Sequence, residues 1–536
     1  MKKSIIPFAL LLCSLFAGAQ SRSFDLGRYM QTQSALMSEL NRSYVDSLPI
    51  ARMQKAGIDA MLSTLDPYTV WVPEEDEENF EMLINKTYGG IGSIIYKPRQ
   101  DGPVLINEPY LGSPAAKAGL RCGDEIFTID GVSTIGITAA QASDKMKGKP
   151  GTVLTLGVRR VYSGKTEDVK IVRERIHLPD IEYAGILEDG FTGYILQSGF
   201  TEGVAAALRS EIKRLRGLGM TRLVLDLRGN GGGIMQEAVD IVGLFVPKGS
   251  VVVTAKGNEL MQDEVYKTGS DPLEPDLPLI VLVDSGSASA SEIVAGSLQD
   301  YDRATIMGSR TFGKGLVQSV RPMPYGGRLK ITTAKYYIPS GRCVQAIDYT
   351  NRNEDGSVGH IPDSLTREFT TAHGRKVRDG GGITPDVLLP RKDYSRITYS
   401  LVLSGIIEQY TLEYVRAHEN IAAAKDYRFD DYGGFIKFAS EKQFDARTAA
   451  RATYDRLVEE LSEDGLEEGL KPELEALKAK IDLDKEAFLR LKKDEIVPFI
   501  EREIIARYYF RPAAVELSLR YDDALKKALE SPLIKI

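Results

Sequence analysis

The stretch that decides the fold is Leu277–Gln318, which reads LPLIVLVDSGSASASEIVAGSLQDYDRATIMGSRTFGKGLVQ. Its apolar run Leu279–Val283 has the length and β-branched content of a buried strand. Small residues follow, then a helix-like segment and a second apolar run, Ala304–Met307. A lysine between two glycines, Lys314, lies near the end of the stretch. The pattern predicts a strand, a tight turn, a helix, a strand and another turn, with serine hydroxyls in the first turn and an amine in the second.

The composition is that of an ordinary folded protein. The chain has 536 residues, enough for two to four domains that each have a core. Hydrophobic residues make up 43% and charged residues 27%, and the net charge of -7 argues against a nucleic-acid partner. The three cysteines do not make a disulfide framework, and spacing leaves open whether Cys122 and Cys343 pair.

The N-terminus has the features of an export signal. Lys2 and Lys3 form a basic start, Ile5–Phe16 is mostly apolar, and Ala17-Gly18-Ala19 fits the small-residue cleavage rule. The apolar stretch is too short to span a bilayer comfortably. We therefore expect residues 1–19 to be removed and the mature protein to be exported, soluble or peripheral to the membrane.

Both ends of the mature chain are predicted to be helical. Residues 20–86 carry apolar side chains at helical spacing on either side of Pro49. Residues 391–536 are rich in Leu, Glu, Lys and Ala with the same spacing, and they contain no chemical motif. These terminal helices are candidate surfaces for a homo-oligomer or for an adaptor protein.

Residues 87–175 change to short strands and glycine turns. The run SPAAKAGLRCGDEIFTIDG covers Ser113–Gly131, and GGIG at Gly89–Gly92 precedes a strand-like run, Ser93–Tyr96. This segment resembles a PDZ domain. The resemblance implies that a peptide adds as a strand beside Ser93–Tyr96. A glycine loop lets several N–H groups converge on one carboxylate without obstruction by Cβ atoms. The residues that would bind the C-terminal carboxylate in this way are Gly90, Ile91 and Gly92.

Residues 176–390 alternate strand and helix patterns, which is typical of an α/β domain. A buried-type strand, Arg222–Leu227, leads into the glycine-rich turn Arg228–Gly233. These glycines lack the spacing of a dinucleotide-binding loop, and the chain has no P-loop motif. Its four histidines form no zinc motif. The sequence therefore indicates neither a metal nor a cofactor.

Serine and lysine remain as candidates for the chemistry. A serine hydroxyl needs a base to take its proton. Lysine can be that base only when neutral, and its reference pKa of about 10.4 leaves about one amine in a thousand neutral near pH 7.4. Lys314 has apolar neighbours and few carboxylates nearby, although most Gly-Lys-Gly lysines lie in surface turns. Backbone N–H groups at a helix start suit an oxyanion. The residues alone do not choose among the three hydroxyls at this start, Ser287, Ser289 and Ser291.

The block around these residues resembles the C-terminal processing (tail-specific) serine peptidases. The runs LVLDLRGNGGG, ITTAKYYIPSGR and GGGITPDV match the same family, over roughly Leu65–Pro390. The resemblance implies a crotonase/Clp-like α/β peptidase core, Ser289 as nucleophile and Lys314 as general base, oriented by Gln318. On a regular strand Lys314 and Gln318 would point to one face. The oxyanion hole implied by the resemblance consists of the N–H groups of Ala290 and Gly232.

The predicted chain is therefore an α/β (α+β) multidomain protein. Its segments are an export signal at 1–19, an N-terminal helical region at 20–86, a PDZ domain at 87–175, a serine peptidase core at 176–390 and a C-terminal helical extension at 391–536. The predicted function is a periplasmic endopeptidase that binds proteins with accessible C-termini. One alternative is a non-catalytic PDZ scaffold with an inactive peptidase fold, and another is a crotonase-like enzyme. The excursion Tyr349–Arg378 exceeds the minimal family pattern and leaves open what gates the site.

Overall fold

The computed structural model describes residues 6–99, 101–258, 262–353, 356–389, 393–445, 447–481 and 484–531. Residues 1–5 of the predicted export signal and 532–536 of the predicted helical extension lie outside these ranges. Backbone contacts divide the chain into two compact units, Met1–Trp71 and Val72–Ile536, and strand β1 (Val70–Val72) lies at the division.

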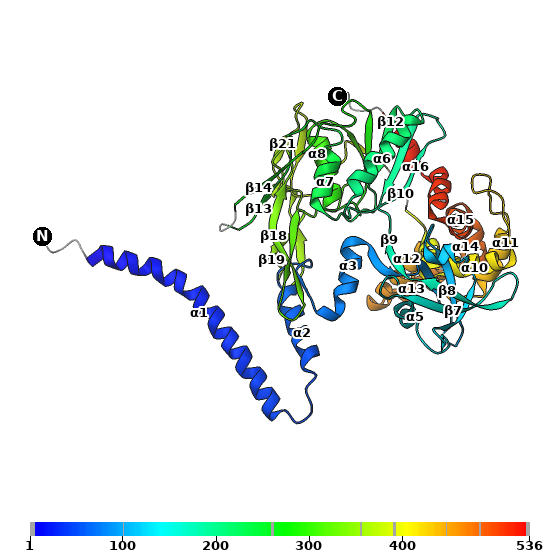
Figure 1. Ribbon diagram of the computed structural model, residues 1–536, viewed down its shortest axis with the longest axis horizontal. Helices are drawn as coiled ribbons and strands as arrows, with labels where there is room; N and C mark the ends of the chain where they lie inside the picture. Colours follow the sequence, from blue (N-terminus) through cyan, green and yellow to red (C-terminus); the bar gives the residue numbers. More distant parts are fainter. Residues whose placement is uncertain are drawn as a thin grey trace. The chain divides into compact units, whose positions relative to one another are not determined.

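The first unit contains the helices α1 (Ile6–Ser43) and α2 (Ile50–Ser63), shown in blue in Figure 1. Pro49 precedes α2, and a proline, which lacks an N–H, could not have continued a preceding helix. Large apolar side chains from Phe24 onward are exposed in this unit. None of the helices in the described part of the chain is long and apolar enough to cross a membrane.

The second unit begins with η1 (Glu74–Asp76) and α3 (Glu77–Asn85), followed by a β-rich domain. Its sheet has the order β3-β4-β5-β7-β8, with β6 on β5, and a separate ladder joins β2 to β9. Apolar side chains of this sheet and of two short helices form one core. The elements are β2 (Thr87–Gly90), β3 (Ser93–Tyr96), β4 (Val104–Pro109), α4 (Pro114–Lys117), β5 (Glu125–Ile129), β6 (Val132–Ser133), α5 (Ala139–Met146), β7 (Val153–Arg159), β8 (Thr166–Val172) and β9 (Glu174–His177).

The central domain is built on a six-stranded sheet in the order β10-β11-β12-β15-β16-β23. β10 is antiparallel to β11, and the following neighbours are parallel. The predicted strand, turn, helix and strand of Leu277–Gln318 are confirmed. The strands are β10 (Ile181–Ile186), β11 (Thr192–Gln197), β12 (Arg222–Asp226), β15 (Leu279–Val283), β16 (Thr305–Gly308) and β23 (Val387–Leu388).

Helices cover both faces of this sheet (Figure 1). Val281 of β15 packs in a cluster with three helices, whereas its neighbour Ile280 packs in a second cluster with α16 (Asp523–Glu530), because successive strand residues point to opposite faces. Both faces are apolar, as expected for a covered parallel sheet. The three helices on the first face are α6 (Val204–Gly217), α7 (Met235–Val242) and α8 (Ala290–Asp300).

A second sheet contains β17, the strand that follows Lys314 in the sequence. β17 and β18 form a long hairpin, and β18 also pairs with β13, which pairs with β14. The predicted excursion Tyr349–Arg378 is made largely of two small hairpins, β19–β20 and β21–β22. The bounds are β13 (Val251–Lys256), β14 (Glu264–Lys267), β17 (Leu316–Pro322), β18 (Arg328–Tyr337), β19 (Ile347–Arg352), β20 (Val358–His360), η2 (Asp363–Leu365), β21 (Glu368–Thr370) and β22 (Lys376–Arg378).

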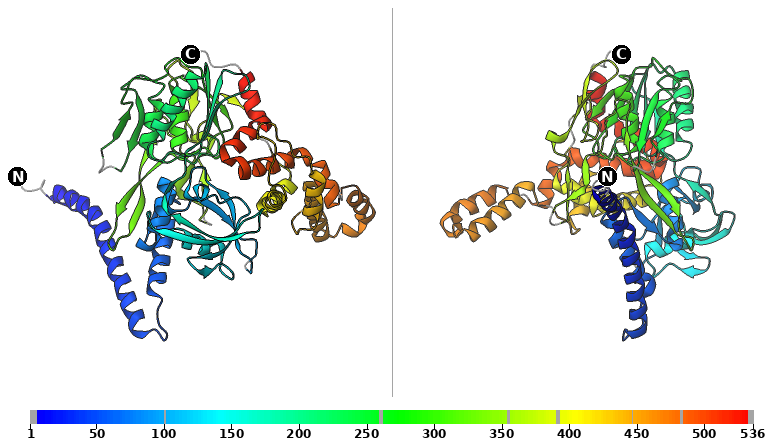
Figure 2. Two further views of the ribbon diagram at one scale, coloured as in Figure 1. Left: turned by 45° about the vertical axis from the view of Figure 1, so that its right-hand side comes forward. Right: turned by 90° about the vertical axis from the view of Figure 1, so that its left-hand side faces the viewer.

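The C-terminal extension is helical, as predicted, and most of it has its own apolar core, with Tyr410, Phe435 and Ile500 among its members. Two helices, α12 and α13, lie side by side as a hairpin and contribute no described residue to that core (Figure 2). The elements are α9 (Arg396–Leu403), α10 (Ile406–Ala417), α11 (Tyr432–Ser440), α12 (Ala449–Glu463), α13 (Glu467–Ile481), α14 (Lys485–Leu491), α15 (Lys493–Ser518) and η3 (Leu519–Tyr521).

Cys122 and Cys343 are both free. Cys122 is buried in the β-rich domain, and burial raises the pKa of its thiol to about 11. The sequence spacing left open whether Cys122 and Cys343 pair, and in this structure they do not form a disulfide.

Candidate active site

The turn between β15 and α8 distinguishes the three candidate serines. The hydroxyls of Ser287 and Ser291 are buried and donate to the backbone carbonyls of Leu227 and Asn230, each at 2.8 Å. Ser289 is only half-buried, and its backbone has φ 56° and ψ −113°. A non-glycine residue in this region costs about 1–3 kcal/mol, and such strain clusters at functional sites. Two hydroxyls are thus committed to holding the turn, and the third lies on the strained residue between them.

A buried carboxylate, Glu292, joins the serine turn to the lysine turn. Its Oε2 accepts the N–H of Ser289 at 2.9 Å and the N–H of Lys314 at 2.8 Å. Its Oε1 accepts the Thr311 hydroxyl at 2.6 Å and the Gly313 N–H at 2.7 Å. Because both backbone nitrogens lie on one oxygen, the Ser289 and Lys314 nitrogens are no more than about 5.7 Å apart. One side chain therefore fixes the two turns that carry the predicted nucleophile and base.

The pKa of Glu292 is shifted by the same surroundings. Burial raises the pKa of its carboxyl to about 7, and the hydrogen bonds from Thr311, Lys314, Ser289 and Gly313 partly oppose that rise. All four partners are donors, so the ionised form is the one that satisfies them. Protonation of the Glu292 carboxylate near pH 7 would remove an acceptor from these hydrogen bonds.

Two further buried side chains hold the lysine turn. The Tyr336 hydroxyl lies 2.6 Å from the Lys314 carbonyl oxygen and 3.2 Å from that of Ser289. Gln345 accepts the Gly315 N–H at 2.7 Å through Oε1. A Cβ atom on Gly315 would lie 2.8 Å from the Gln345 nitrogen, which explains why a glycine follows the lysine. Tyr336 thus makes a second bridge between the serine and lysine turns.

Gln318 does not share a regular strand with Lys314. β17 begins at Leu316, after the lysine, and the β17–β18 register shifts between Val317 and Gln318. A common face for the two side chains required an uninterrupted strand, and that condition is not met. The Gln318 amide nitrogen donates to the Thr332 hydroxyl at 3.2 Å. Its role in orienting the lysine stays a prediction.

The glycine-rich turn after β12 lies against Ser289. A Cβ atom on Gly232, which has φ +95°, would lie 2.8 Å from the Ser289 Cβ and 2.9 Å from the Ala290 nitrogen. Only glycine fits this close approach. The two predicted oxyanion donors, Gly232 and Ala290, are thus brought together. Here the Gly232 N–H donates to Asn230 Oδ1 at 2.9 Å.

Asp284 ties the same glycine turn to the serine turn from the other end. Its Oδ1 accepts the N–H of Gly229 at 2.8 Å and of Gly286 at 2.9 Å. A Cβ atom on Gly286 would lie 2.9 Å from the Gly229 Cα, so the two turns touch through their backbones. The relative position of the serine turn and the glycine-rich turn is therefore set by the Asp284 carboxylate and by a close backbone contact.

The predicted peptide-binding loop forms a separate group in the β-rich domain. Gly90 ends β2, the Ile91 carbonyl accepts the Ala115 N–H at 2.9 Å, and Gly92 has φ +71°. A Cβ atom on Gly92 would lie 2.5 Å from the Ser113 Cβ, so no other residue fits there. The loop leads into β3, which is the terminal strand of its sheet among the strands that the structure describes.

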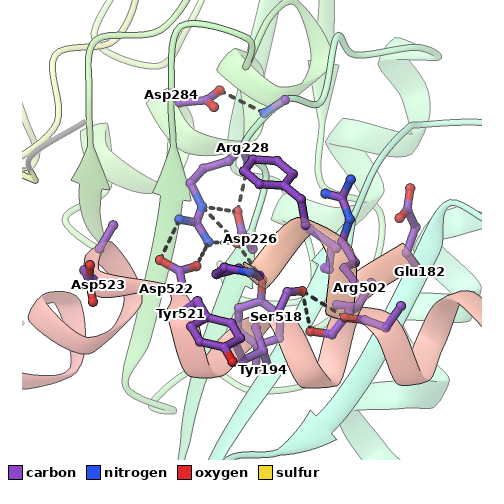
Figure 3. A pocket seen from close by; sticks show the side chains of 18 of the residues that line it. Glu182, Tyr194, Asp226, Arg228, Asp284, Arg502, Ser518, Tyr521, Asp522 and Asp523 are labelled. Atoms are coloured by element: carbon purple, nitrogen blue, oxygen red, sulfur yellow. Dashed lines mark hydrogen bonds and ion pairs between the residues drawn. The ribbon is translucent and has the colours of Figure 1, made fainter. Parts of the chain in front are cut away.

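A cavity of about 890 Å³ lies between the carboxyl ends of the core strands and the C-terminal helices (Figure 3). Arg228, at the start of the glycine-rich turn, extends between Asp226 and Asp522, with 2.5 Å from its Nη2 to Asp522 Oδ2. Burial would raise the pKa of Asp522, but the hydrogen bonds and charge of Arg228 hold it below its usual range. The Tyr194 hydroxyl donates to Asp226 at 2.6 Å. The cavity wall thus connects the start of α16 to the start of the glycine-rich turn.

The comparisons with known proteins agree with these features. Residues 191–351 match peptidase family S41, residues 105–160 match a PDZ domain, and residues 397–531 match the family "Probable PDZ-protease, C-terminal helical domain". A carboxy-terminal-processing protease of Bartonella bacilliformis is 37% identical over 350 residues, which cover 63% of this chain and 79% of the relative.

The chain belongs to the carboxy-terminal processing proteases of peptidase family S41. A "Probable CtpA-like serine protease" of Staphylococcus aureus is 35% identical over 309 residues, 57% of this protease and 60% of that relative. The solved structure of a photosystem II D1 C-terminal processing protease covers 66% of this protease and 90% of that chain, at 24% identity and a TM-score of 0.34. The predictions of a serine peptidase of this family, of a PDZ domain and of the mixed α/β fold are confirmed.

The site also contains residues that sequence reasoning missed: Glu292, Tyr336, Gln345, Asn230 and Asp284. Glu292 carried a readable signal, because a serine followed three residues later by a glutamate is the capping-box pattern of a helix start. Tyr336 and Gln345 act through contacts between segments far apart in the sequence, for which there is no local pattern, whereas Asn230 and Asp284 also accept the N–H two residues further on.

Proposed function

We propose that this protease is an exported endopeptidase that captures the C-termini of protein substrates through its PDZ domain and cleaves them with Ser289 and Lys314. The observation that carries the proposal is the Glu292 carboxylate, which holds the backbone N–H groups of both residues on one oxygen, at 2.9 and 2.8 Å. A nucleophile and a base need this kind of fixed proximity.

The reaction starts when the Ser289 oxygen attacks the carbonyl carbon of the scissile bond and its proton passes to the neutral Lys314 amine. The oxyanion that forms accepts the N–H groups of Ala290 and Gly232. Because the Gly232 N–H also points to Asn230, that hydrogen bond must open or be shared as the oxyanion forms. The Lys314 ammonium then gives its proton to the departing amine, and an acyl-enzyme remains.

Water completes the cycle by the same route. Lys314 takes a proton from a water molecule, which attacks the ester carbon, and the tetrahedral species releases Ser289 with the proton returned to its oxygen. Gln318 orients the lysine amine in this scheme. No cofactor and no metal enter any step.

Substrate selection is assigned to the glycine loop of the PDZ domain. The N–H groups of Gly90, Ile91 and Gly92 would receive the terminal carboxylate, and the preceding residues would pair with the open edge of β3. Export is supported by the basic start, apolar run and small-residue site of residues 1–19, and the periplasm is the compartment we propose.

Two matched substrates test this function. An unfolded protein with an apolar C-terminal residue is incubated separately with the mature protease and with its variants Ser289→Ala and Ser291→Ala. All three proteases must be folded to the same extent. The wild type should cleave it and Ser289→Ala should not. The same substrate with an amidated C-terminus should be cleaved at least about tenfold more slowly, because one charge-assisted contact is lost.

Each arm has a contrary outcome. Equal cleavage by Ser289→Ala would remove the nucleophile assignment, and equal cleavage of the amidated substrate would remove the role of the glycine loop. If the wild type cleaves neither substrate, the alternative that this chain is a non-catalytic scaffold would be favoured.

A further inference from the structure

The α12–α13 hairpin has an apolar stripe on one side. Within the described residues of the hairpin, the side chains buried at its seam are Tyr454 and Leu474. Three leucines beside the seam are well exposed, with Leu457 at 39%, Leu470 at 40% and Leu477 at 43%. Scattered single leucines would mean little, so the question is whether these three share a face.

Helix geometry places them on one face. With about 100° per residue, Leu457 lies about 60° from Tyr454 in one rotational sense, because it follows by three residues. Leu477 follows Leu474 by three residues and Leu470 precedes it by four, so both are displaced in that same sense, by about 60° and 40°. Since α12 and α13 are antiparallel, equal displacement in each helix leads to the same side of the hairpin (Figure 2).

The hairpin is also electrically polar along its length. Its outer part, residues 457–473, has seven acidic residues and one lysine, whereas its basal part, residues 447–456 and 474–481, has five basic and two acidic residues. On the leucine side, helical spacing places Glu460 and Asp464 toward the tip and Lys480 toward the base. The net charge is therefore negative at the tip and positive at the base.

We infer that the leucine face of this hairpin binds the same face of a second copy of the chain, with the two hairpins antiparallel. A two-fold axis brings Leu457, Leu470 and Leu477 of each copy into one small four-helix core. The same axis places the acidic tip of each copy against the basic base of the other, whereas a parallel arrangement would bring like charges together. Charge complementarity therefore selects a second copy, and one orientation of it.

The inference is independent of the peptidase chemistry, because no residue of the hairpin belongs to the catalytic turns. Each helix has 15 residues, so the interface is at the small end of known sizes. We expect a weak dimer whose dissociation constant rises with salt concentration, because part of its attraction is electrostatic.

Charge reversal tests the arrangement on the full chain. One variant reverses the tip (Glu460→Lys with Asp464→Lys) and another reverses the base (Arg447→Glu with Lys480→Glu). In sedimentation experiments each variant alone should dimerise at least about tenfold more weakly than the wild type. Their equimolar mixture should recover wild-type affinity, because each reversed half then faces its complement.

Other results would overturn the inference. A wild type that stays monomeric, variants that dimerise like the wild type, or weakened variants whose mixture is not rescued would each exclude the antiparallel pair. The last result would indicate that another protein covers this face.

Cross-linking gives a readout that does not depend on charge. Leu457→Cys, which lies at the boundary between tip and base and therefore beside the proposed two-fold axis, should form a disulfide between two copies under mild oxidation. Glu459→Cys, on the opposite side of α12, is the matched control and should not. Equal cross-linking at both positions would contradict the assigned face.

Discussion

The two turns that carry Ser289 and Lys314 and the α12–α13 hairpin differ in how firmly contacts within the chain fix them. Around Ser289 and Lys314, buried side chains such as Glu292, together with close backbone contacts, fix both turns. In the hairpin, Tyr454 and Leu474 are buried, and the rest of the surface that the structure describes is half-exposed or exposed. We therefore expect substitutions in the turns to impair the single chain. Substitutions on the leucine face should affect only the association of two chains.

The largest effect should come from Glu292→Gln. An amide offers one acceptor oxygen and turns an NH₂ group toward donors, so two donors in the junction, at least one of them a backbone N–H, lose their acceptor. We expect kcat/KM on an unfolded protein substrate to fall by about 10³-fold, since leaving a buried donor unpaired costs about 1–3 kcal/mol. Thr311→Val removes one donor to Glu292 and also the acceptor of the Ile383 N–H, and we expect it to cost less than Glu292→Gln. A Glu292→Gln variant within tenfold of the wild type would show that the junction is not needed.

The next effect concerns Gly232. Gly232→Ala places a methyl group against Ser289 and forces a positive φ on alanine, so the oxyanion donors should move apart. We expect kcat to fall by about 10²-fold, the size typical of losing one oxyanion donor. Gly231→Ala is the matched control, because a Cβ atom there meets nothing within 4 Å. Equal losses in both variants would indicate a general effect on the turn.

The junction between the last helix and the core gives a stability prediction. Asp522→Ala leaves the half-buried Arg228 guanidinium with Asp226 as its remaining carboxylate partner and removes the N-cap acceptor of the Leu525 N–H. We expect a loss of about 2 kcal/mol in the free energy of unfolding, measured in urea. Asp523→Ala changes an exposed carboxylate and should cost less than about 0.5 kcal/mol. Similar losses would mean that the buried pair does not anchor α16.

The acid limb of the pH–rate profile should report on Glu292. With a pKa of about 7, its carboxyl protonates as the pH falls below neutrality, so kcat/KM should drop by about tenfold per pH unit below that value. The Thr311 hydrogen bond lowers this pKa, so Thr311→Val should move the limb to higher pH. A limb that stays in place in Thr311→Val would belong to a different group.

The smallest effect is expected on the leucine face. Leu477→Ser should change the unfolding free energy of the dilute chain by less than about 0.5 kcal/mol, because the side chain is already exposed. Leu474→Ser, at the buried seam, should cost about 2 kcal/mol or more. Equal costs would show that the leucine face is packed within one chain, which would remove the contrast between the two regions.

Much of this fold was predictable from local pattern. The strand Leu279–Val283 and the helix after it followed from apolar length and spacing, and the PDZ and peptidase assignments followed from motifs. The roles of Tyr336 and Gln345 were not predictable, because each reaches the lysine turn from a later segment that only folding brings near. A face shared by Lys314 and Gln318 required a regular strand, but β17 begins only at Leu316 and its register shifts before Gln318. Local rules thus predict elements, whereas the contacts that fix a site are long-range.

The proposed mechanism requires that Lys314 activates Ser289 and no other serine in the turn. A fluorophosphonate that labels activated serines tests it directly, with the modified residue located by mass spectrometry of the digested protein. We expect rapid labelling of Ser289 in the wild type and none of Ser287 or Ser291. In Lys314→Ala, labelling of Ser289 should be at least about 10²-fold slower. Labelling of Ser289 at the wild-type rate in Lys314→Ala, or modification of a neighbouring serine, would contradict it.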